Sequence, residues 1–389
     1  MAGEFASIPV INYEDAVSAE TKPQFLSALK HALVNVGFFY LQNPPIGVEV
    51  RERLINRTAS FFELPEEKKQ EVAMMNSKHF RGYSQLGVEK TAAKNDQRET
   101  LTPLMLAIIL KVGFDFPERD SDLPDYYNLL GPNQWLPEST APGLRQAIES
   151  YLKETQTLAN QFVTLVAEAL DLPPATFNQF FDRAPLSLLR IAAYPPPNDL
   201  KSLETQGVGP HKDGNFLTYL LQGTEHSSLE VQSRSGKWIS APPIPNTLVV
   251  NIGRSLETLT QGVCVATTHR VNLRPDQYLG ADENASLGTR LSFPFFQMLS
   301  LDVSEDSMKL ELPSHVLAMR GAKAKSDAET FFEKIFSGLA GEAVLINAIT
   351  SYPEVSARWY PKLMEDALRQ QHTGRELDYA RLRQEMIKD

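Results

Sequence analysis

Apolar residues recur along this chain with two different periods, and the change of period separates its parts. In the first part, apolar positions follow helical spacing over residues 21–36, 47–75 and 140–171. Two short runs there have strand character instead, "SIPVIN" at 7–12 and "FFYLQ" directly after Gly37, which we expect to end the first helix. Helical spacing returns from about residue 326. The pattern predicts helices toward both ends of the chain.

The middle of the chain, from 186 to 297, has short β-rich runs separated by Gly, Pro and Asn. These runs are "LSLLRIAAY", "NFLTYLLQ", "SLEVQS", "KWISA", "TLVVNIG", "THRVNL" and "RLSFPFF". Their close spacing predicts an antiparallel sandwich or barrel rather than alternating strands and helices. We therefore expect one domain over 1–389, mainly β with flanking helices. It comprises a mostly helical 1–180, a β core at 181–300 and a helical extension at 301–389.

Composition limits the classes of function. The chain has 389 residues, 42% of them hydrophobic, with a formal net charge of −10. An acidic chain is not expected to bind nucleic acid or anionic membranes, which attract clustered Lys and Arg. The single cysteine, Cys264, allows neither an internal disulfide nor a thiolate metal cluster. With no secretory signal or membrane span in the sequence, we expect a cytoplasmic protein whose partner is a small molecule.

Candidate chemistry begins at "GPHKDGN", where His211 stands two residues before Asp213. On one extended strand the two side chains would share a face. A third metal ligand should come from another strand of the same region. His226 lies in a turn-like polar segment, whereas His269 begins an alternating strand and is the better candidate. Two imidazoles and one carboxylate form the ligand set typical of non-haem Fe(II) oxygenases; alone, His211 would fit a hydrogen-bonded turn.

A second feature follows at "RLSFPFF", where Arg290 and Ser292 alternate along a strand and point the same way. An Arg fork beside a hydroxyl suits the far carboxylate of a dicarboxylate co-substrate. Upstream, "LRIAAYPPP" places Tyr194 at the end of a strand before a run of prolines.

At this point the sequence resembles the isopenicillin N synthase-like family of Fe(II)/2-oxoglutarate-dependent oxygenases. The similarity covers nearly the whole chain and keeps its order. It rests on "SIPVIN", "VNVGFFYLQN", "RGYSQLGVE", "AYPPP", "PHKDGNFLTYLLQ", "GKWISAPPIPNTLVVNIG" and "THRV". The resemblance implies a double-stranded β-helix, or jelly-roll, enclosing Fe(II). It also implies an enzyme that uses O₂ and 2-oxoglutarate to oxidise a small organic substrate, most commonly by hydroxylation, with release of succinate and CO₂.

The resemblance also implies roles for individual residues. His211, Asp213 and His269 would be the metal ligands and the catalytic centre. Arg290 and Ser292 would bind the C5 carboxylate of 2-oxoglutarate, with Tyr194 as a further partner. The substrate would lie against the "GVEKTAAKNDQRET" loop and the β core, under a C-terminal segment around 348–356. The candidate substrate contacts are Glu89, Thr91, Asp96, Glu99, Arg190, Phe216 and Phe296.

The sequence also departs from the family pattern. Lys212 and Arg254 replace residues common in the family, both outside the expected ligand set. The segment 273–288 is longer than in many members, which makes Arg274 a competitor of Arg290 for the co-substrate.

Several alternatives to the assigned function remain. These are an oxidase of the same fold that needs no 2-oxoglutarate and an ethylene-forming enzyme. More remote are a non-catalytic binding protein and a zinc hydrolase, neither of which would need all five residues of the two sites.

Overall fold

Two β-sheets form the centre of the protein in the computed structural model. The structure describes residues 7–91, 94–102, 104–106, 123–181, 185–196, 205–278, 287–304, 306–308, 310–321 and 339–372. The larger sheet has the order β1-β2-β14-β11-β16-β9-β6-β3, with β8 pairing with both β16 and β7. Its strands are β1 (Val10–Asn12), β2 (Phe38–Gln42), β3 (Gly82–Ser84), β6 (Glu99–Thr102), β7 (Leu104–Leu106), β8 (Pro185–Leu189), β9 (Ile191–Tyr194), β11 (Leu217–Gln222), β14 (Thr247–Ile252) and β16 (Arg290–Ser300).

The smaller sheet is antiparallel and has the order β10-β15-β12-β13. Its strands are β10 (Thr205–His211), β12 (Leu229–Gln232), β13 (Trp238–Ser240) and β15 (His269–Leu273). Leu220 and Val249 of the larger sheet share an apolar cluster with Leu229 and Val231 of the smaller one. The predicted mainly β architecture is therefore confirmed as two sheets packed face to face. A separate hairpin joins β4 (Lys90–Thr91) to β5 (Lys94–Asn95).

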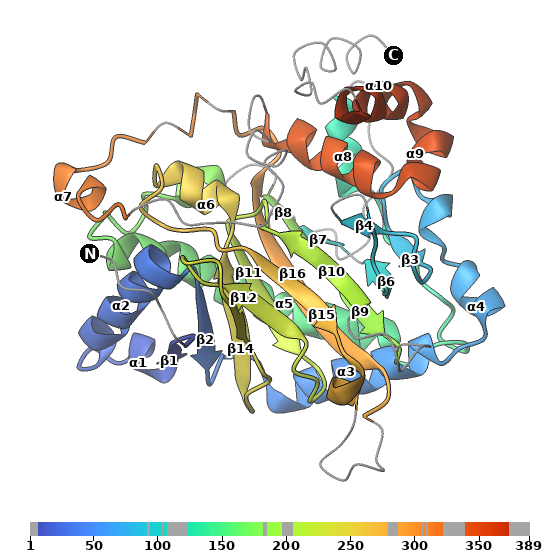
Figure 1. The fold of residues 1–389 in the computed structure, drawn as a ribbon, viewed down its shortest axis with the longest axis horizontal. Helices are drawn as coiled ribbons and strands as arrows, with labels where there is room; N and C mark the ends of the chain where they lie inside the picture. The colour runs from blue at the N-terminus through green and yellow to red at the C-terminus, as the bar shows by residue number, and fades with distance from the viewer. Residues whose placement is uncertain are drawn as a thin grey trace.

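Helices from both ends of the chain surround the sheets (Figure 1). The N-terminal part contributes α1 (Glu14–Val17), α2 (Lys22–His31), α3 (Val48–Phe62), α4 (Glu66–Gln70) and the long α5 (Leu144–Ala169). Helix α5 packs against α2, α3, β11 and β16. Its fully buried Phe162 stacks on Phe39 of β2 and meets the ring of Tyr219 of β11 edge-on. This contact fixes the larger sheet from outside.

The later helices lie at the opposite end of the molecule from α1 and α2 (Figure 1). They are α8 (Ala340–Ser351), α9 (Pro353–Trp359) and α10 (Pro361–His372), while α6 (Arg254–Leu259) and α7 (Ser314–Leu317) are short. Helix α8 contacts β16, and the ring of Tyr360 stacks on Phe80. The helical extension is thus anchored to the β core over its described residues; 373–389 and 322–338 of the expected helical tail lie outside them.

Two predicted helices have different limits in the structure. The helix predicted over 21–36 consists of α2 and a π-helical turn, Ala32–Val36, and ends at Gly37 with a φ of 78°. A Cβ at Gly37 would lie 2.2 Å from Thr267 Oγ1, so only glycine fits there. The helical spacing over 47–75 corresponds to two helices: Pro65 separates α3 from α4, and a 3₁₀ turn, Met74–Asn76, follows.

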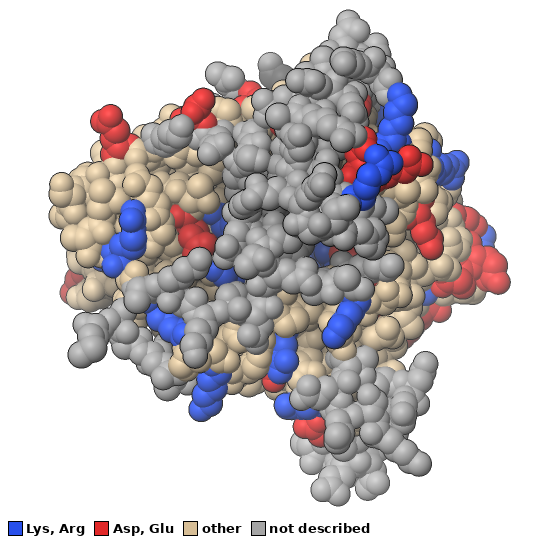
Figure 2. Space-filling view, turned by 45° about the horizontal axis from the view of Figure 1, so that its top comes forward, with Lys and Arg blue, Asp and Glu red and all other residues tan. Residues whose placement is uncertain are grey.

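The outer surface agrees with the acidic composition. On the face seen in Figure 2, basic and acidic side chains are interspersed over the described residues. Among the described residues, no helix is both long and apolar enough to cross a membrane.

Candidate active site

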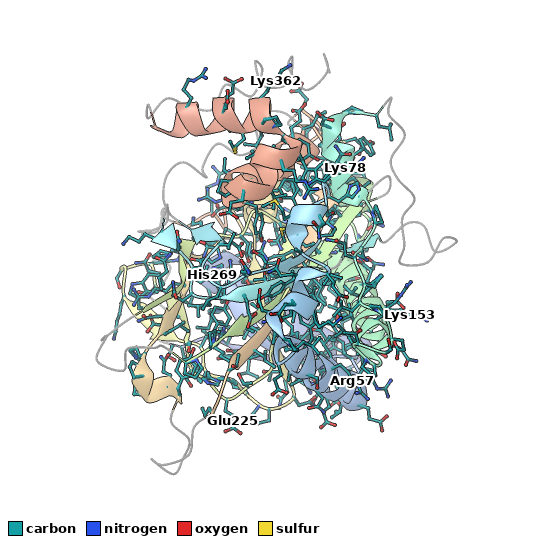
Figure 3. All side chains as sticks on the ribbon, turned by 90° about the vertical axis from the view of Figure 1, so that its right-hand side faces the viewer. Arg57, Lys78, Lys153, Glu225, His269 and Lys362 are labelled. Carbon is teal, nitrogen blue, oxygen red and sulfur yellow. The ribbon has the colours of Figure 1, made fainter. Side chains whose placement is uncertain are left out.

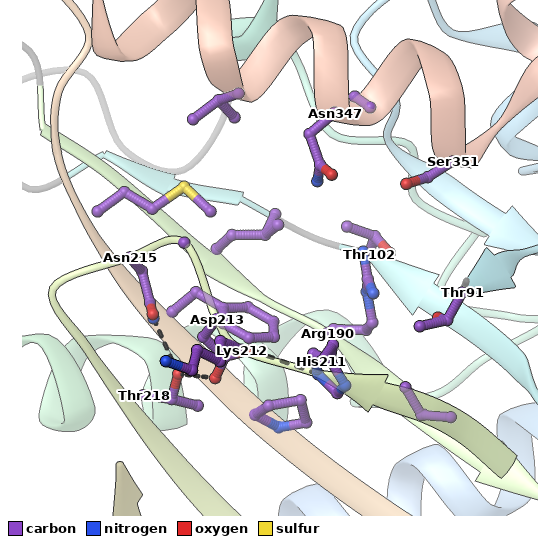
Figure 4. A pocket seen from close by; sticks show the side chains of 18 of the residues that line it. Thr91, Thr102, Arg190, His211, Lys212, Asp213, Asn215, Thr218, Asn347 and Ser351 are labelled. Carbon is purple, nitrogen blue, oxygen red and sulfur yellow. Dashed lines mark hydrogen bonds and ion pairs between the residues drawn. The ribbon is translucent and has the colours of Figure 1, made fainter. Parts of the chain in front are cut away.

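One cavity of about 260 Å³ lies between the two sheets and beneath α8. Its floor comes from β10, β11, β15 and β16, and its roof from one face of α8, including Asn347 and Ser351 (Figure 4). Alternate residues of β16 line it, from Arg290 through Ser292 to Met298. This follows from the period-two geometry of a strand, which turns every second side chain to the same face.

His211, Asp213 and His269 meet at the floor of this cavity. His211 ends β10 and is directly paired with His269, the first residue of β15. Asp213 Oδ1 lies 3.5 Å from His211 Nε2 and 3.8 Å from His269 Nε2. One ligand atom from each residue lies within 4.8 Å of the other two, so the three could hold a metal ion. Figure 3 shows His269 deep inside the molecule, in contrast to surface residues such as Lys153 and Lys362.

The convergence of the three residues has a different local origin from the one predicted. A single extended strand was expected to carry His211 and Asp213, but β10 ends at His211 and Asp213 lies in the following bend. The bend is fixed from β11 and β14, because Asp213 Oδ2 accepts hydrogen bonds from Thr218 Oγ1 at 2.6 Å and Asn251 Nδ2 at 2.8 Å. The other oxygen, Oδ1, is thereby aimed at the histidines.

Hydrogen bonds also orient the two imidazoles. His211 Nδ1 lies 2.8 Å from the carbonyl of Gly209, and His269 Nδ1 lies 3.1 Å from the carbonyl of Thr267. When Nδ1–H donates to these carbonyls, the lone pair of each Nε2 faces Asp213, as metal ligands require. The edge of Phe38 packs on His269.

The electrostatics of the three residues suit a cation. Burial lowers the pKa of His269 to about 4, with a further lowering from His211, so the imidazole is neutral near pH 7. Burial alone would raise the pKa of the Asp213 carboxyl, but the two histidines and the Thr218 hydroxyl lower it below its ordinary value. One carboxylate beside two imidazoles is the ligand set of a divalent metal.

Substitution of Asn251 tests whether the orientation of the Asp213 carboxylate matters for metal binding. We expect Asn251→Ala to weaken iron binding about 10- to 100-fold, the usual effect of removing a partner that orients a metal ligand. Anaerobic titration with Fe(II) measures this change. Asn272→Ala is the matched control, because Asn272 is a buried asparagine of the smaller sheet with no contact to Asp213. Equal iron affinities in both variants would contradict the role of Asn251.

Arg290 and Ser292 lie on the wall of the same cavity. Arg290 is only 2% exposed, and its Nη1 has no hydrogen-bond partner among the described residues. Its guanidinium stacks on the ring of Tyr194, 4.5 Å from the ring centre, because the two residues are paired between β9 and β16. A buried guanidinium with an unused donor is incomplete without an anionic ligand.

The competing candidates lie elsewhere. The side chain of Arg274 is 39% exposed, interacts with Glu230 and Asp276, and does not line the cavity. His226 is held by Thr224 and the carbonyl of Gly288, outside the histidine–aspartate group. Residues 279–286 of the long segment 273–288 lie outside the described residues.

Four of the predicted substrate contacts, Glu89, Thr91, Arg190 and Phe296, line the cavity. Arg190 Nη1 binds Glu89 Oε1 at 2.7 Å, and Arg190 lies above the ring of Phe296. In Figure 4, Arg190 lies between His211 and the side chains of Asn347 and Ser351.

The other predicted contacts do not reach the cavity. Phe216 was predicted to line the cavity, but its ring packs in the core against Phe177 and Phe181. It precedes the first residue of β11, so strand alternation does not apply to it. Glu99 turns outward to Lys69 and Tyr83. Asp96 is fully buried behind the wall and accepts from Thr91.

The structure adds cavity residues that were not predicted. Arg81 and Arg98 come directly before the short strands β3 and β6, for which the hydrophobic pattern predicted no strand. Asn347, Ser351 and Tyr352 come from α8 and its end. Only the expectation that residues 348–356 cover the site pointed toward this group.

Comparison with known proteins agrees with this geometry. Residues 8–138 match the N-terminal model of the non-haem dioxygenases in morphine synthesis, and residues 185–298 match the 2OG-Fe(II) oxygenase superfamily. A 2-oxoglutarate-dependent dioxygenase of Gibberella zeae is 41% identical over 384 residues, covering 98% of each chain. The dioxygenase frbJ of a Dothideomycetidae species is 40% identical over 379 residues, covering 95% of this chain and 96% of that protein.

A more distant relative is the homoarginine-6-hydroxylase 2-ODD-C23.1 of Arabidopsis thaliana, 30% identical over 72% of this chain and 83% of that protein. Among solved structures, a full-length Neurospora crassa protein in complex with alpha-KG superposes with a TM-score of 0.63 at 22% identity, over 89% of this chain and 96% of that one. A putative 2OG-Fe(II) oxygenase family protein of Caulobacter crescentus has a TM-score of 0.62 at 23% identity, over 85% and 99%. The shared fold is the double-stranded β-helix. The chain therefore belongs to the isopenicillin N synthase-like Fe(II)/2-oxoglutarate oxygenases and is a 2-oxoglutarate-dependent dioxygenase.

Proposed function

We propose that His211, Asp213 and His269 bind Fe(II), and that Arg290 and Ser292 bind the C5 carboxylate of 2-oxoglutarate, with Tyr194 beside it. The observation that carries this proposal is the meeting of all these residues in one cavity. The donor set fits iron, because both Nε2 atoms and Asp213 Oδ1 face one point while hydrogen bonds hold their other atoms. The unused Nη1 of Arg290 fits a carboxylate.

When bound, iron and 2-oxoglutarate supply the oxidising chemistry: one oxygen atom of O₂ enters succinate as 2-oxoglutarate loses CO₂, and the other enters a C–H bond of the substrate. The chain orients the reactants. Thr218 and Asn251 fix the Asp213 carboxylate, and Arg290 compensates the distant negative charge of the co-substrate. Helix α8 and Tyr352 cover the cavity and keep bulk water away from the reacting atoms.

The proposed reaction is hydroxylation of a small organic molecule. The homoarginine-6-hydroxylases among the relatives support this outcome, because their names describe a hydroxylation. Arg190, Glu89, Thr91 and Phe296 are the proposed substrate contacts, since they line the cavity on the α8 side of the metal ligands.

We also propose a domain organisation and a cellular location for the protein. Residues 1–180, 181–300 and 301–389 would act as one oxygenase domain, supported by helices from both ends that pack on the same larger sheet. A cytoplasmic location without nucleic-acid or membrane partners is supported by the net charge of −10 and the single cysteine.

A substrate screen tests the function. The enzyme is supplied with Fe(II), 2-oxoglutarate and O₂, and succinate is measured with and without each candidate compound. A substrate should stimulate succinate release and yield a product heavier by one oxygen atom. Product formed without succinate would favour the 2-oxoglutarate-independent oxidase, and ethylene in the headspace would favour the ethylene-forming type.

A further inference from the structure

We propose that the substrate is an organic acid whose anionic group binds among Arg81, Arg98 and Arg190 next to Tyr352, and whose apolar part lies toward β16. We call these three arginines the arginine cluster. The inference rests on the proposed function, because it assigns the substrate class of that same cavity. All three arginines and Tyr352 line the cavity, and Tyr352 lies close enough to interact electrostatically with each of the arginines.

The arginine cluster carries one positive charge more than its carboxylate partners balance. Glu89 Oε1 lies 2.7 Å from Arg190 Nη1 and 3.0 Å from Arg98 Nη2, and Arg98 also lies 3.2 Å from Asp96. Arg81 has no carboxylate partner among the described residues. Its two Nη atoms donate only to the backbone carbonyls of Phe80 and Leu129, and it is 2% exposed. Three guanidinium groups thus meet two carboxylates, and a buried, uncompensated charge is costly unless a ligand of opposite sign binds.

Unused hydrogen-bonding atoms gather at the same place. The Nε atoms of Arg81, Arg98 and Arg190 are buried and have no hydrogen-bond partner in the described structure. The Tyr352 hydroxyl lies beside the Glu89 carboxylate. Burial raises the pKa of Tyr352, Arg190 lowers it and a hydrogen bond to Glu89 raises it again, so the hydroxyl keeps its proton. Buried polar groups are normally hydrogen-bonded. Three unused Nε donors and a protonated phenol around one excess positive charge define a site for an acceptor-rich anion such as a carboxylate.

Apolar side chains line the part of the cavity between β8, β16 and α8. Leu188, Phe296 and Met298 line it from β8 and β16, and Ala343, Val344 and Ala348 line it from α8. Small residues on α8 leave room for a ligand body between the helix and the sheet. Together with the arginine cluster, this wall matches a molecule with an acid group at one end and a hydrocarbon part at the other.

Glu89 gives the strongest argument for a cationic substrate, because it is a buried carboxylate that lines the cavity. However, Glu89 already interacts with two arginines at 3.0 Å or less. A ligand cation bound there would face the whole arginine cluster, and like charges at short range in a buried site repel strongly. The charge balance therefore favours the acid.

Calorimetric titration with matched probes tests the inference. The enzyme is saturated with Fe(II) and 2-oxoglutarate under nitrogen and titrated with octanoate and 4-phenylbutyrate, then with the corresponding amides and amines. We expect each acid to bind at least about 10-fold more tightly than its amide, the effect of a charge-assisted hydrogen bond, and more tightly than its amine. Tyr352→Phe and Arg81→Gln should each weaken acid binding about 10-fold and leave amide and 2-oxoglutarate binding unchanged.

Tyr352→Phe removes only a hydroxyl, so the variant should fold normally, which its melting temperature verifies. Arg274→Gln is the control, because Arg274 lies outside the cavity. The inference is overturned if acids bind no better than their amides or amines, or if neither substitution affects acid binding. A separate titration of the Fe(II)-loaded enzyme with 2-oxoglutarate distinguishes the two proposals, because failure of 2-oxoglutarate to bind would instead refute the proposed function.

Discussion

Replacing Asp213 or His269 by alanine is expected to abolish iron binding and succinate formation together. Each residue supplies one of three ligand atoms that lie within 4.8 Å of one another. Loss of a residue that only orients a ligand typically lowers metal affinity about 10- to 100-fold. Loss of a ligand should therefore lower iron affinity by more than about 100-fold. Iron content after anaerobic loading and succinate formation are the two measurements.

The matched control for these variants is His226→Gln. His226 is a buried histidine of the same β region, but its ring nitrogens face Thr224 and Gly288 rather than Asp213. It should retain iron and turnover. Retention of iron by His269→Ala, or its loss from His226→Gln, would contradict the assignment.

Arg290→Leu is expected to raise the Kd of 2-oxoglutarate at least about 30-fold and to leave iron binding unchanged. Removing one partner of a buried charge pair costs roughly 2 kcal/mol or more, which corresponds to that factor. The free protein should tolerate the change, since it removes a buried charge that has an unused donor. Anaerobic calorimetry with 2-oxoglutarate provides the measurement.

Two further variants sharpen this prediction. Arg290→Lys should restore only part of the affinity, because an ammonium group cannot make the paired hydrogen bonds of a guanidinium. Arg274→Leu should have the same Kd for 2-oxoglutarate as the unsubstituted protein. The reverse order of effects, with Arg274 more important than Arg290, would mean that the co-substrate site has been misplaced.

The periodicity of the sequence was sufficient to predict the elements whose patterns are local. Phe38–Gln42 and Thr247–Ile252 lie within the predicted strands, and Leu144–Ala169 lies within the predicted helix. The strands β3 to β7 were not predicted, because each has only two to four residues, and β6 and β7 pair with the distant strands β9 and β8. For β10, an extended strand was expected at His211, but not its start at Thr205 or its end before Asp213, and its pairing with β15 is irregular.

In the candidate site, too, features set by local sequence were predicted and features set by tertiary contacts were not. Arg290 and Ser292 were predicted to share a face by simple alternation, and both line the cavity. The bend that brings Asp213 to the histidines depends on Thr218 and Asn251, which are remote from each other in sequence. The arginine cluster and Tyr352 come from separate segments. Their meeting depends on tertiary packing that spacing does not reveal.

A crystal structure of the protein with Fe(II) and 2-oxoglutarate, grown without O₂, tests the central claim most directly. It should show one iron ion bound by His211 Nε2, an Asp213 oxygen and His269 Nε2, with the C5 carboxylate of 2-oxoglutarate on Arg290 and Ser292. An ion held by other residues, or a carboxylate on Arg274, would contradict it.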